Sequence, residues 1–221
     1  MLKGITTVLF DLDGTLADSM TVWTNIDIQF FEKRNMEFPD TIQKEIEGMS
    51  FTETAAYFKR RFHLPETVDE LKAIWSAQAI DEYRYHVKLK PGAREFIAYL
   101  RSQNIKIGIA SSNSRELLDT FFEAQNMTKD IDVVVTSCDV CAGKPAPDVY
   151  LKAAQLLEAK PEECLVFEDI PMGILAGKNA GMTVCAVDDL YSSGMTDEKK
   201  QLADYFIHDF FEVMNQTYEV L

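Results

Sequence analysis

Short apolar runs rich in β-branched residues recur along the chain, and they predict buried strands. The predicted strands are residues 6–10, 105–110, 132–136, 164–167 and 183–187, with a weaker one at 205–207. Segments with helical periodicity alternate with them, roughly at residues 92–103, 114–125, 147–158, 172–180 and 209–216. This alternation predicts an α/β fold in which a parallel sheet carries helices on both faces.

Residues 18–87 break the alternation, because they show helical periodicity and no convincing strand. We expect an all-helical cap domain to be inserted here after the first strand, with residues 1–17 and 88–221 forming the core. The pair Pro91-Gly92 lies just after the second junction. It ends one secondary-structure element, and the next helix begins after it. Two short connections of this kind suit a hinged lid.

The composition is that of an ordinary packed protein. With 221 residues, 47% hydrophobic and 26% charged, the chain can form a core domain and a small inserted one, and it is neither disordered nor fibrous. The 36 acidic and 22 basic side chains give a net charge of −14. Nucleic acid is therefore not an expected partner, because phosphate backbones favour clustered Lys and Arg.

Membrane and secretion signals are not expected from the sequence. No stretch approaches the ~20 apolar residues of a membrane span, and Asp11 interrupts the first apolar run. We expect a cytoplasmic protein and, as the simplest state, a monomer. The four cysteines are too few for a disulfide framework, and we interpret Cys138 and Cys141 as loop residues because no second cysteine pair follows.

Polar residues collect where the predicted strands end. These residues are Asp11 and Asp13 after the first strand, Ser111, Ser112 and Asn113 after the second, Lys144 after the third, and Glu168 and Asp169 after the fourth. Open parallel sheets bind ligands beyond the carboxyl ends of their strands. We therefore expect one site at this edge.

The acidic residues at this edge predict a metal ion. Asp11 and Asp13 are two positions apart, so an extended chain directs both side chains to the same side. Two carboxylates about 4 Å apart repel by roughly 4 kcal/mol at an effective dielectric of ~20, so a cation is needed to hold the group together. The three histidines are scattered, which disfavours zinc. We infer Mg²⁺, held chiefly by Asp11 and Asp169.

The same residues suit phosphoryl transfer. A cation and Lys144 would offset the repulsion between an anionic nucleophile and a phosphate dianion. Asp11 would attack phosphorus and become an aspartyl-phosphate, while Asp13 would protonate the leaving alcohol and then activate water. Ser111 would donate a hydrogen bond to a phosphate oxygen, and Gly14 would let the backbone turn close to the ligand.

Four motifs lie in order along the chain: the run DLDGTLADS at residues 11–19, Ser111, the run GKPAPD at residues 143–148, and Glu168-Asp169. With them the sequence resembles the haloacid dehalogenase-like hydrolase superfamily. More narrowly it is similar to the branch that holds phosphoglycolate phosphatase and β-phosphoglucomutase. The resemblance implies a Mg²⁺-dependent enzyme with an aspartate nucleophile, built on a Rossmann-like, doubly wound parallel sheet with a helical cap.

The resemblance also implies a role for each site residue. Asp11 is the nucleophile and Asp13 the acid and base. Phosphate is bound by Ser111 and Lys144, with Ser112 and Asn113 as further candidates, and metal is bound by Asp11, the Asp13 carbonyl and Asp169, with Glu168 in support.

Two departures decide between activities within the family. Trp23 and Phe51 stand where the β-phosphoglucomutases have a histidine and an arginine, and neither can titrate or carry charge. We therefore expect hydrolysis of a small phosphomonoester of the sugar or polyol class, with Trp23 and Phe51 as candidate specificity residues. Three alternatives stay open: a phosphomutase, a non-catalytic phosphate-binding regulatory protein, and a phosphonate hydrolase that would need Lys33 or Lys44 to form a Schiff base.

Overall fold

The computed structural model describes residues 1–46 and 48–221, and within them seven strands form one sheet in the order β5-β4-β1-β6-β7-β8-β9. The strands are β1 Thr7–Phe10, β4 Lys106–Ser111, β5 Val133–Thr136, β6 Cys164–Glu168, β7 Thr183–Val187, β8 Tyr205–Ile207 and β9 Glu219–Val220. Neighbouring strands are parallel except β8 and β9, which are antiparallel. The α/β fold with a parallel sheet is confirmed.

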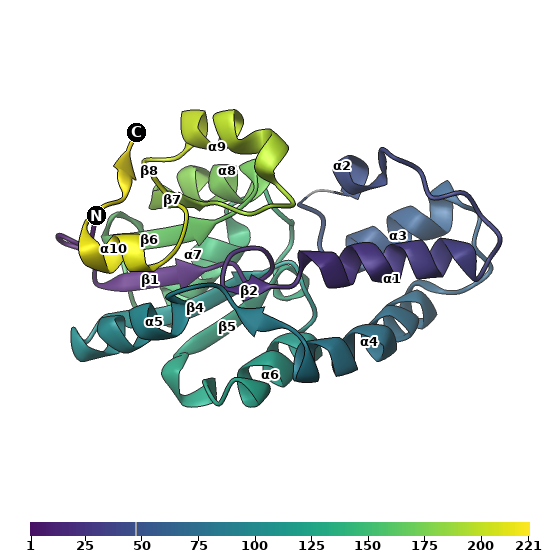
Figure 1. Ribbon diagram of the computed structural model, residues 1–221, viewed down its shortest axis with the longest axis horizontal. Coiled ribbons are helices and arrows are strands. Elements are labelled where there is room, and N and C mark those ends of the chain that lie inside the picture. Colours follow the sequence, from purple (N-terminus) through teal and green to yellow (C-terminus); the bar gives the residue numbers. More distant parts are fainter. Residues whose placement is uncertain (47) are drawn as a thin grey trace.

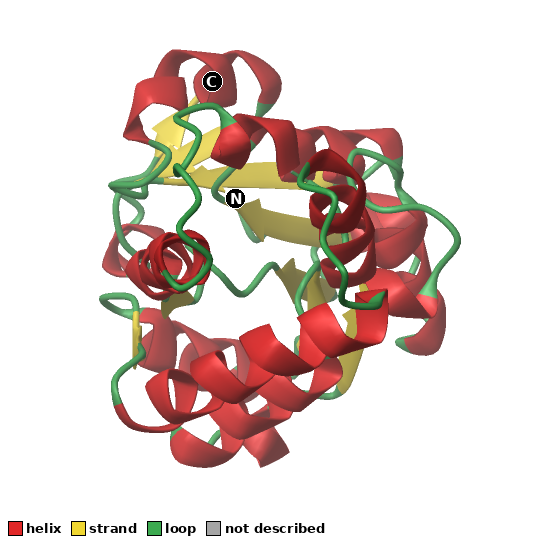
Figure 2. Ribbon diagram, turned by 90° about the vertical axis from the view of Figure 1, so that its right-hand side faces the viewer, coloured by secondary structure: helices red, strands yellow, loops and turns green. Residues whose placement is uncertain are grey.

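Helices cover both faces of this sheet (Figure 2). They are α5 Ala93–Ser102, α6 Arg115–Ala124, α7 Asp148–Leu156, α8 Pro171–Asn179, α9 Thr196–Leu202 and α10 Phe211–Asn215, with short 3₁₀ turns η1 Thr128–Asp130, η2 Ser137–Asp139, η3 Pro161–Glu163 and η4 Ser193–Met195. Successive residues of a strand point to opposite faces. Accordingly Val8 and Phe10 pack with α5 and α10, whereas Leu9 packs with α7 and α8.

The central strand β1 is buried along its whole length between β4 and β6. Phe10, its last residue, is in register with Ile109 of β4 and Phe167 of β6. The residues that follow these strands therefore leave the sheet at the same edge. None of the helices in the described part of the chain combines the length and the apolar character that a membrane span requires.

A second unit, the helical cap of residues 20–85, lies beyond this edge and away from both chain termini (Figure 1). Its helices are α1 Met20–Glu32, α2 Ile42–Ile46, α3 Phe51–Arg61 and α4 Val68–Tyr85. The strands β2 Ala17–Asp18 and β3 Lys88–Leu89 pair with each other and connect the cap to the sheet. The helices lie where the sequence predicts them, and the domain boundaries at 17/18 and 87/88 stay a prediction.

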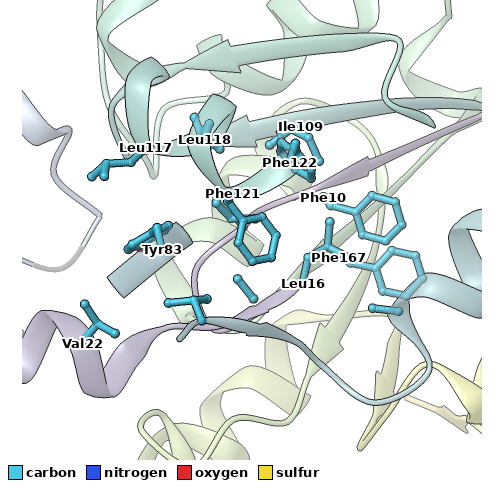
Figure 3. Packing of buried hydrophobic residues seen from close by; sticks show 14 of the residues in the cluster. Phe10, Leu16, Val22, Tyr83, Ile109, Leu117, Leu118, Phe121, Phe122 and Phe167 are labelled. Carbon is cyan, nitrogen blue, oxygen red and sulfur yellow. The ribbon is translucent and has the colours of Figure 1, made fainter. Parts of the chain in front are cut away.

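The cap and the sheet share one apolar core. The rings of Phe30, Phe58 and Trp75 pack together inside the cap. Tyr83 of α4 meets Phe121 of α6 with ring centroids 6.4 Å apart (Figure 3). Capping boxes at the start of α3 and of α4 fix where these helices begin.

Candidate active site

The ends of β1 and β6 place Asp11, Glu168 and Asp169 side by side. The backbone N–H of Asp11 donates to the Phe167 carbonyl at 3.1 Å, which extends the pairing one residue past β1. Lys144, from the loop between η2 and α7, reaches the same edge. Its Nζ lies 2.6 Å from Asp11 Oδ1 and 2.5 Å from Glu168 Oε1. Separate strand ends thus contribute to one buried cluster of charges.

Burial has opposite effects on the two signs of charge in this cluster. It disfavours the charged form of Lys144, but the attraction of Asp11 and Glu168 outweighs it and raises the pKa of Lys144 above its ordinary value. Burial raises the pKa of Asp11 to about 8, against the attraction of Lys144 and with added repulsion from Glu168 and Asp13. Burial and the charges of Glu168 and Asp11 also raise the pKa of Asp169 well above its usual range.

These carboxylates fit a divalent cation. One oxygen each from Asp11, Glu168 and Asp169 can be chosen so that all lie within 4.8 Å of one another, and all three residues are buried. Burial is the main cause of the raised pKa values of Asp11 and Asp169, and repulsion between the neighbouring carboxylates adds to it, so a cation at this place would favour their charged forms. A donor set made only of oxygen atoms is the preference of Mg²⁺.

Glu168 is held by protein donors on both of its oxygens. Tyr150 OH and Lys144 Nζ each lie 2.5 Å from Oε1, and the Asp169 N–H donates to Oε2 at 3.2 Å. The first turn of α8 packs closely against the Glu168 side chain, since a Cβ on Gly173 would lie 2.0 Å from the carboxyl carbon of Glu168. Glu168 therefore contacts both Lys144 and the backbone of the neighbouring Asp169, and the supporting part that the sequence resemblance implies for it stays a prediction.

Asp169 is oriented by its surroundings. Thr15 Oγ1 donates to Asp169 Oδ1 at 3.0 Å, and Ser192 Oγ donates to the Asp169 carbonyl at 2.8 Å. A Cβ on Gly14 would lie 2.2 Å from Asp169 Oδ2. The glycine, with φ +80°, therefore makes the turn after β1 and leaves space for the Asp169 carboxylate.

The side chain of Asp13 lies in a different environment from that of Asp11. Ser19 Oγ donates to Oδ1 at 2.5 Å, Tyr83 OH also donates to Oδ1, and Asn113 Nδ2 donates to Oδ2 at 2.9 Å. Burial and the charge of Asp13 raise the pKa of Tyr83 far above its usual range, so its hydroxyl keeps its proton. The two aspartates, only two positions apart, thus have unlike partners.

The segment after β4 lines the site with hydroxyl groups and one amide. Ser111 is buried, and its Oγ accepts from the Asn113 N–H at 3.1 Å, which leaves the hydroxyl proton able to face a ligand. The Ser112 carbonyl accepts from the Phe51 N–H at 2.9 Å and so ties the start of α3 to the core. The amide of Asn113 is directed to Asp13 and Tyr83.

A cavity of about 230 Å³ lies between the sheet edge and the cap. Asp11, Asp13, Ser111 and Lys144 line one side of it, with Ser112, Asn113 and Asp169. Apolar side chains of the cap line much of the rest, and these include Met20, Trp23, Met49, Phe51 and Trp75. The structure therefore brings Trp23 and Phe51 to the same cavity as the carboxylates, with their ring centroids 6.1 Å apart.

Three residues that contact the site lie outside the sequence motifs. Asp13 is contacted by Tyr83, Glu168 by Tyr150, and the Asp169 carbonyl by Ser192. In each pair the two residues are well separated in the chain. Tyr83 falls within a helical pattern that otherwise predicts only packing. No short motif marks such a residue, whereas Ser19 lies inside the DLDGTLADS run.

A parallel sheet whose strand ends gather buried carboxylates, a lysine and a serine at one cavity defines an enzyme of the phosphoryl-transfer type. The model of the family described as "Haloacid dehalogenase-like hydrolase" matches residues 8–187. The chain therefore belongs to this family, and the resemblance read from its motifs is confirmed.

Relatives and solved structures agree with this assignment. The chain is 34% identical to a bifunctional riboflavin kinase/FMN phosphatase of Arabidopsis thaliana over 83% of its own length, and it spans 48% of that protein. It is 29% identical to the validoxylamine A 7'-phosphate phosphatase of Streptomyces hygroscopicus subsp. limoneus, over 93% of this chain and 94% of that one.

Among solved structures, a β-phosphoglucomutase from Clostridium difficile has the same fold. The TM-score is 0.79 at 20% identity, and the match covers 96% of each chain. The family match together with the two relatives, both named phosphatases, confirms the expectation of an enzyme of the phosphatase class.

Proposed function

We propose that the protein is a Mg²⁺-dependent phosphatase that hydrolyses a small phosphomonoester through an aspartyl-phosphate on Asp11. The observation that carries this proposal is the unlike pairing of the two aspartates at one cavity. Asp11 is paired with the buried cation of Lys144, and Asp13 is held by hydroxyl and amide donors. Two carboxyl groups in unlike environments can take unlike roles in one reaction.

In the first half-reaction a carboxylate oxygen of Asp11 attacks phosphorus. The bond from phosphorus to the leaving alcohol oxygen breaks, and Asp13 gives its proton to that oxygen. Lys144 offsets the negative charge that would otherwise keep the Asp11 carboxylate away from a phosphate dianion. Ser111, with its hydroxyl proton available, donates to a phosphate oxygen.

In the second half-reaction water attacks the phosphorus of the aspartyl-phosphate. Asp13 takes a proton from that water, and the bond between phosphorus and the Asp11 oxygen breaks. Phosphate leaves, and both aspartates return to their starting forms. Mg²⁺ held by Asp11, Asp169 and the Asp13 carbonyl, with Glu168 in support, would supply positive charge to the phosphate oxygens.

The apolar side of the cavity would contact the alcohol part of the substrate, which becomes the leaving group. Trp23 and Phe51 line the cavity and give apolar contact to the carbon skeleton of a sugar or polyol phosphate, the class that we propose. Neither can hold a second phosphate by charge, which favours hydrolysis over retransfer in a mutase. The names of the relatives mention compounds as different as FMN and validoxylamine A 7'-phosphate, which supports the proposal that the cap selects the substrate. A cytoplasmic monomer acting on a phosphorylated metabolite is part of the same proposal.

The test is a screen of phosphate release with Mg²⁺ present, run over sugar phosphates, polyol phosphates, phosphoglycolate, nucleotides and pyrophosphate. We expect strong release from at least one monoester and none after chelation with EDTA. Isomerisation of a sugar phosphate without release would establish the mutase. Binding without turnover of any compound would establish the regulatory protein. Full activity in excess EDTA would refute the metal assignment.

A further inference from the structure

Tyr83 is a fully buried residue of the cap that contacts the acid/base aspartate of the core. It lies in the last turn of α4, before β3 leads back to the sheet. Its hydroxyl accepts from Trp23 Nε1 at 2.7 Å and from Asn113 Nδ2 at 3.1 Å, and it donates to Asp13 Oδ1. The family motifs quoted from the sequence do not include Tyr83.

The direction of these hydrogen bonds follows from the chemistry of the groups. An indole N–H and an amide NH₂ can only donate, and a phenol has one proton to give. The orientation of the Asn113 amide is fixed because its Oδ1 accepts from the Ser114 N–H at 2.7 Å. With both neighbouring nitrogens donating to its oxygen, Tyr83 must direct its single proton to Asp13.

The two oxygens of Asp13 are therefore not equivalent. Oδ1 receives two donors, Ser19 and Tyr83, whereas Oδ2 receives only Asn113. A carboxylate oxygen has about two lone-pair sites. Oδ1 is saturated by protein donors, and Oδ2 keeps one site for a proton or a ligand.

We propose that Tyr83 is a positioning residue for Asp13, which occupies Oδ1 and leaves Oδ2 as the oxygen that gives and takes the catalytic proton. This rests on the proposed phosphatase function. In the first half-reaction the proton passes from Oδ2 to the alcohol oxygen as the bond from that oxygen to phosphorus breaks. In the second it passes from the attacking water back to Oδ2 as the bond between phosphorus and Asp11 breaks.

The position of Tyr83 also connects this chemistry to the cap. Two of the residues in the network, Trp23 of α1 and Tyr83 of α4, belong to the cap, while Asp13 and Asn113 belong to the core. The proposed alignment of Asp13 therefore depends on the cap as well as on the core, because Tyr83 adds its contact to those of Ser19 and Asn113.

The experiment is Tyr83→Phe, which removes the hydroxyl and keeps the ring that packs against Trp23 and Phe121. On the best monoester of the screen we expect kcat to fall at least about tenfold, with KM within about twofold, because general acid–base catalysis contributes roughly 10²–10⁴-fold. Single-turnover alcohol release is then compared for phenyl phosphate and p-nitrophenyl phosphate. Only phenoxide needs a proton to leave readily, so the variant should slow release of phenol and spare release of nitrophenol.

A matched control is Tyr57→Phe, which removes another cap hydroxyl, one that donates to Glu45 outside the cavity. It should leave both rates unchanged. A second variant, Trp23→Phe, removes a donor that orients the Tyr83 hydroxyl. It should also slow release of phenol more than release of nitrophenol, but by a smaller factor than Tyr83→Phe does. If Tyr83→Phe folds poorly, the comparison of Trp23→Phe with Tyr57→Phe still tests the proposal.

Several outcomes would overturn the proposal. A Tyr83→Phe enzyme with wild-type kcat would overturn it. So would an equal fall in the rate of alcohol release from phenyl phosphate and from p-nitrophenyl phosphate in both Tyr83→Phe and Trp23→Phe. Failure of the proposed function looks different, because the wild-type protein would then release no phosphate from any monoester, or Asp13→Asn would turn over normally.

Discussion

Lys144 lies with its Nζ 2.6 Å from Asp11 Oδ1, and only 6% of Lys144 and 7% of Asp11 is exposed. The lysine is thus a built-in cation for the proposed nucleophile, and it is shared with Glu168. An ion pair of this kind contributes little net stability, but removing one partner leaves uncompensated charge in the interior. The stability of the protein should therefore depend strongly on Lys144.

Lys144→Met is expected to lower the free energy of unfolding of the metal-free protein by about 3–5 kcal/mol, because Glu168, which is fully buried and shares this lysine with Asp11, is left without its cation. Mg²⁺ should restore part of this loss, since it supplies positive charge at the same carboxylates. Urea unfolding with and without Mg²⁺ measures both effects. Lys200→Met is the control: its pairing with Glu219 is exposed, so we expect a change below about 1 kcal/mol. Equal losses in the two variants would contradict the buried role of Lys144.

Asp11→Asn should abolish turnover and leave the fold intact. The amide cannot act as a nucleophile, but it has nearly the shape of the protonated acid that burial favours at this position. We expect activity to fall by at least about 10³-fold, with a thermal midpoint of the metal-free protein equal to or above that of the wild type. Phosphate release and a circular dichroism melt test this, and near wild-type turnover would remove Asp11 from the mechanism.

The raised pKa of Asp11 predicts a pH dependence for the metal-free protein. The pKa moves from 3.8 to about 8 on folding, so the folded state binds more protons between these values. The stabilising contribution of this group is full below 3.8 and is lost as pH rises through about 8. Because Mg²⁺ binds the deprotonated form, its stabilising effect should grow over the same range.

The measurement is the rise in thermal midpoint on adding Mg²⁺, taken at about pH 6.5 and about pH 8.5. We expect the larger rise at the higher pH, and the difference should shrink in Asp11→Asn. A rise of the same size at both values would show that Mg²⁺ does not compete with a proton at Asp11.

Much of the fold could be predicted because its strands are buried on both faces. Such strands appear in the sequence as continuous apolar runs, as at Thr7–Phe10 and Thr183–Val187. The strand order could not be predicted in the same way. β1 pairs with β4 and β6, which lie far from it in the chain, as the partners Thr7 and Lys106 and Thr7 and Cys164 show, and no local pattern encodes these contacts.

The site was predictable where it depends on strand ends, because residues that follow parallel strands must share an edge of the sheet. Asp11, Lys144 and Asp169 were predicted in this way, and the structure places them close together. The unlike partners of Asp11 and Asp13 were not predicted, because an alternating pattern says only that both side chains leave the chain on one side, where both do line the cavity. The turn at Gly14, whose backbone N–H donates to the Ala17 carbonyl at 2.9 Å, ends the extended chain there. Tyr83 then reaches Asp13 from the cap.

Gly14→Ala should have two effects. Like any side chain at a positive φ it should strain the backbone, and in addition it should weaken Mg²⁺ binding. The new Cβ would lie 2.2 Å from Asp169 Oδ2 and would push that carboxylate out of place. Gly4→Ala is the matched control, because Gly4 has φ +83° and nothing within 4 Å of the built Cβ. Both variants should lose about 1–2 kcal/mol of unfolding free energy from the left-handed backbone alone. Only Gly14→Ala should lower Mg²⁺ affinity, measured by titration calorimetry, and unchanged affinity would argue that Asp169 does not hold the metal.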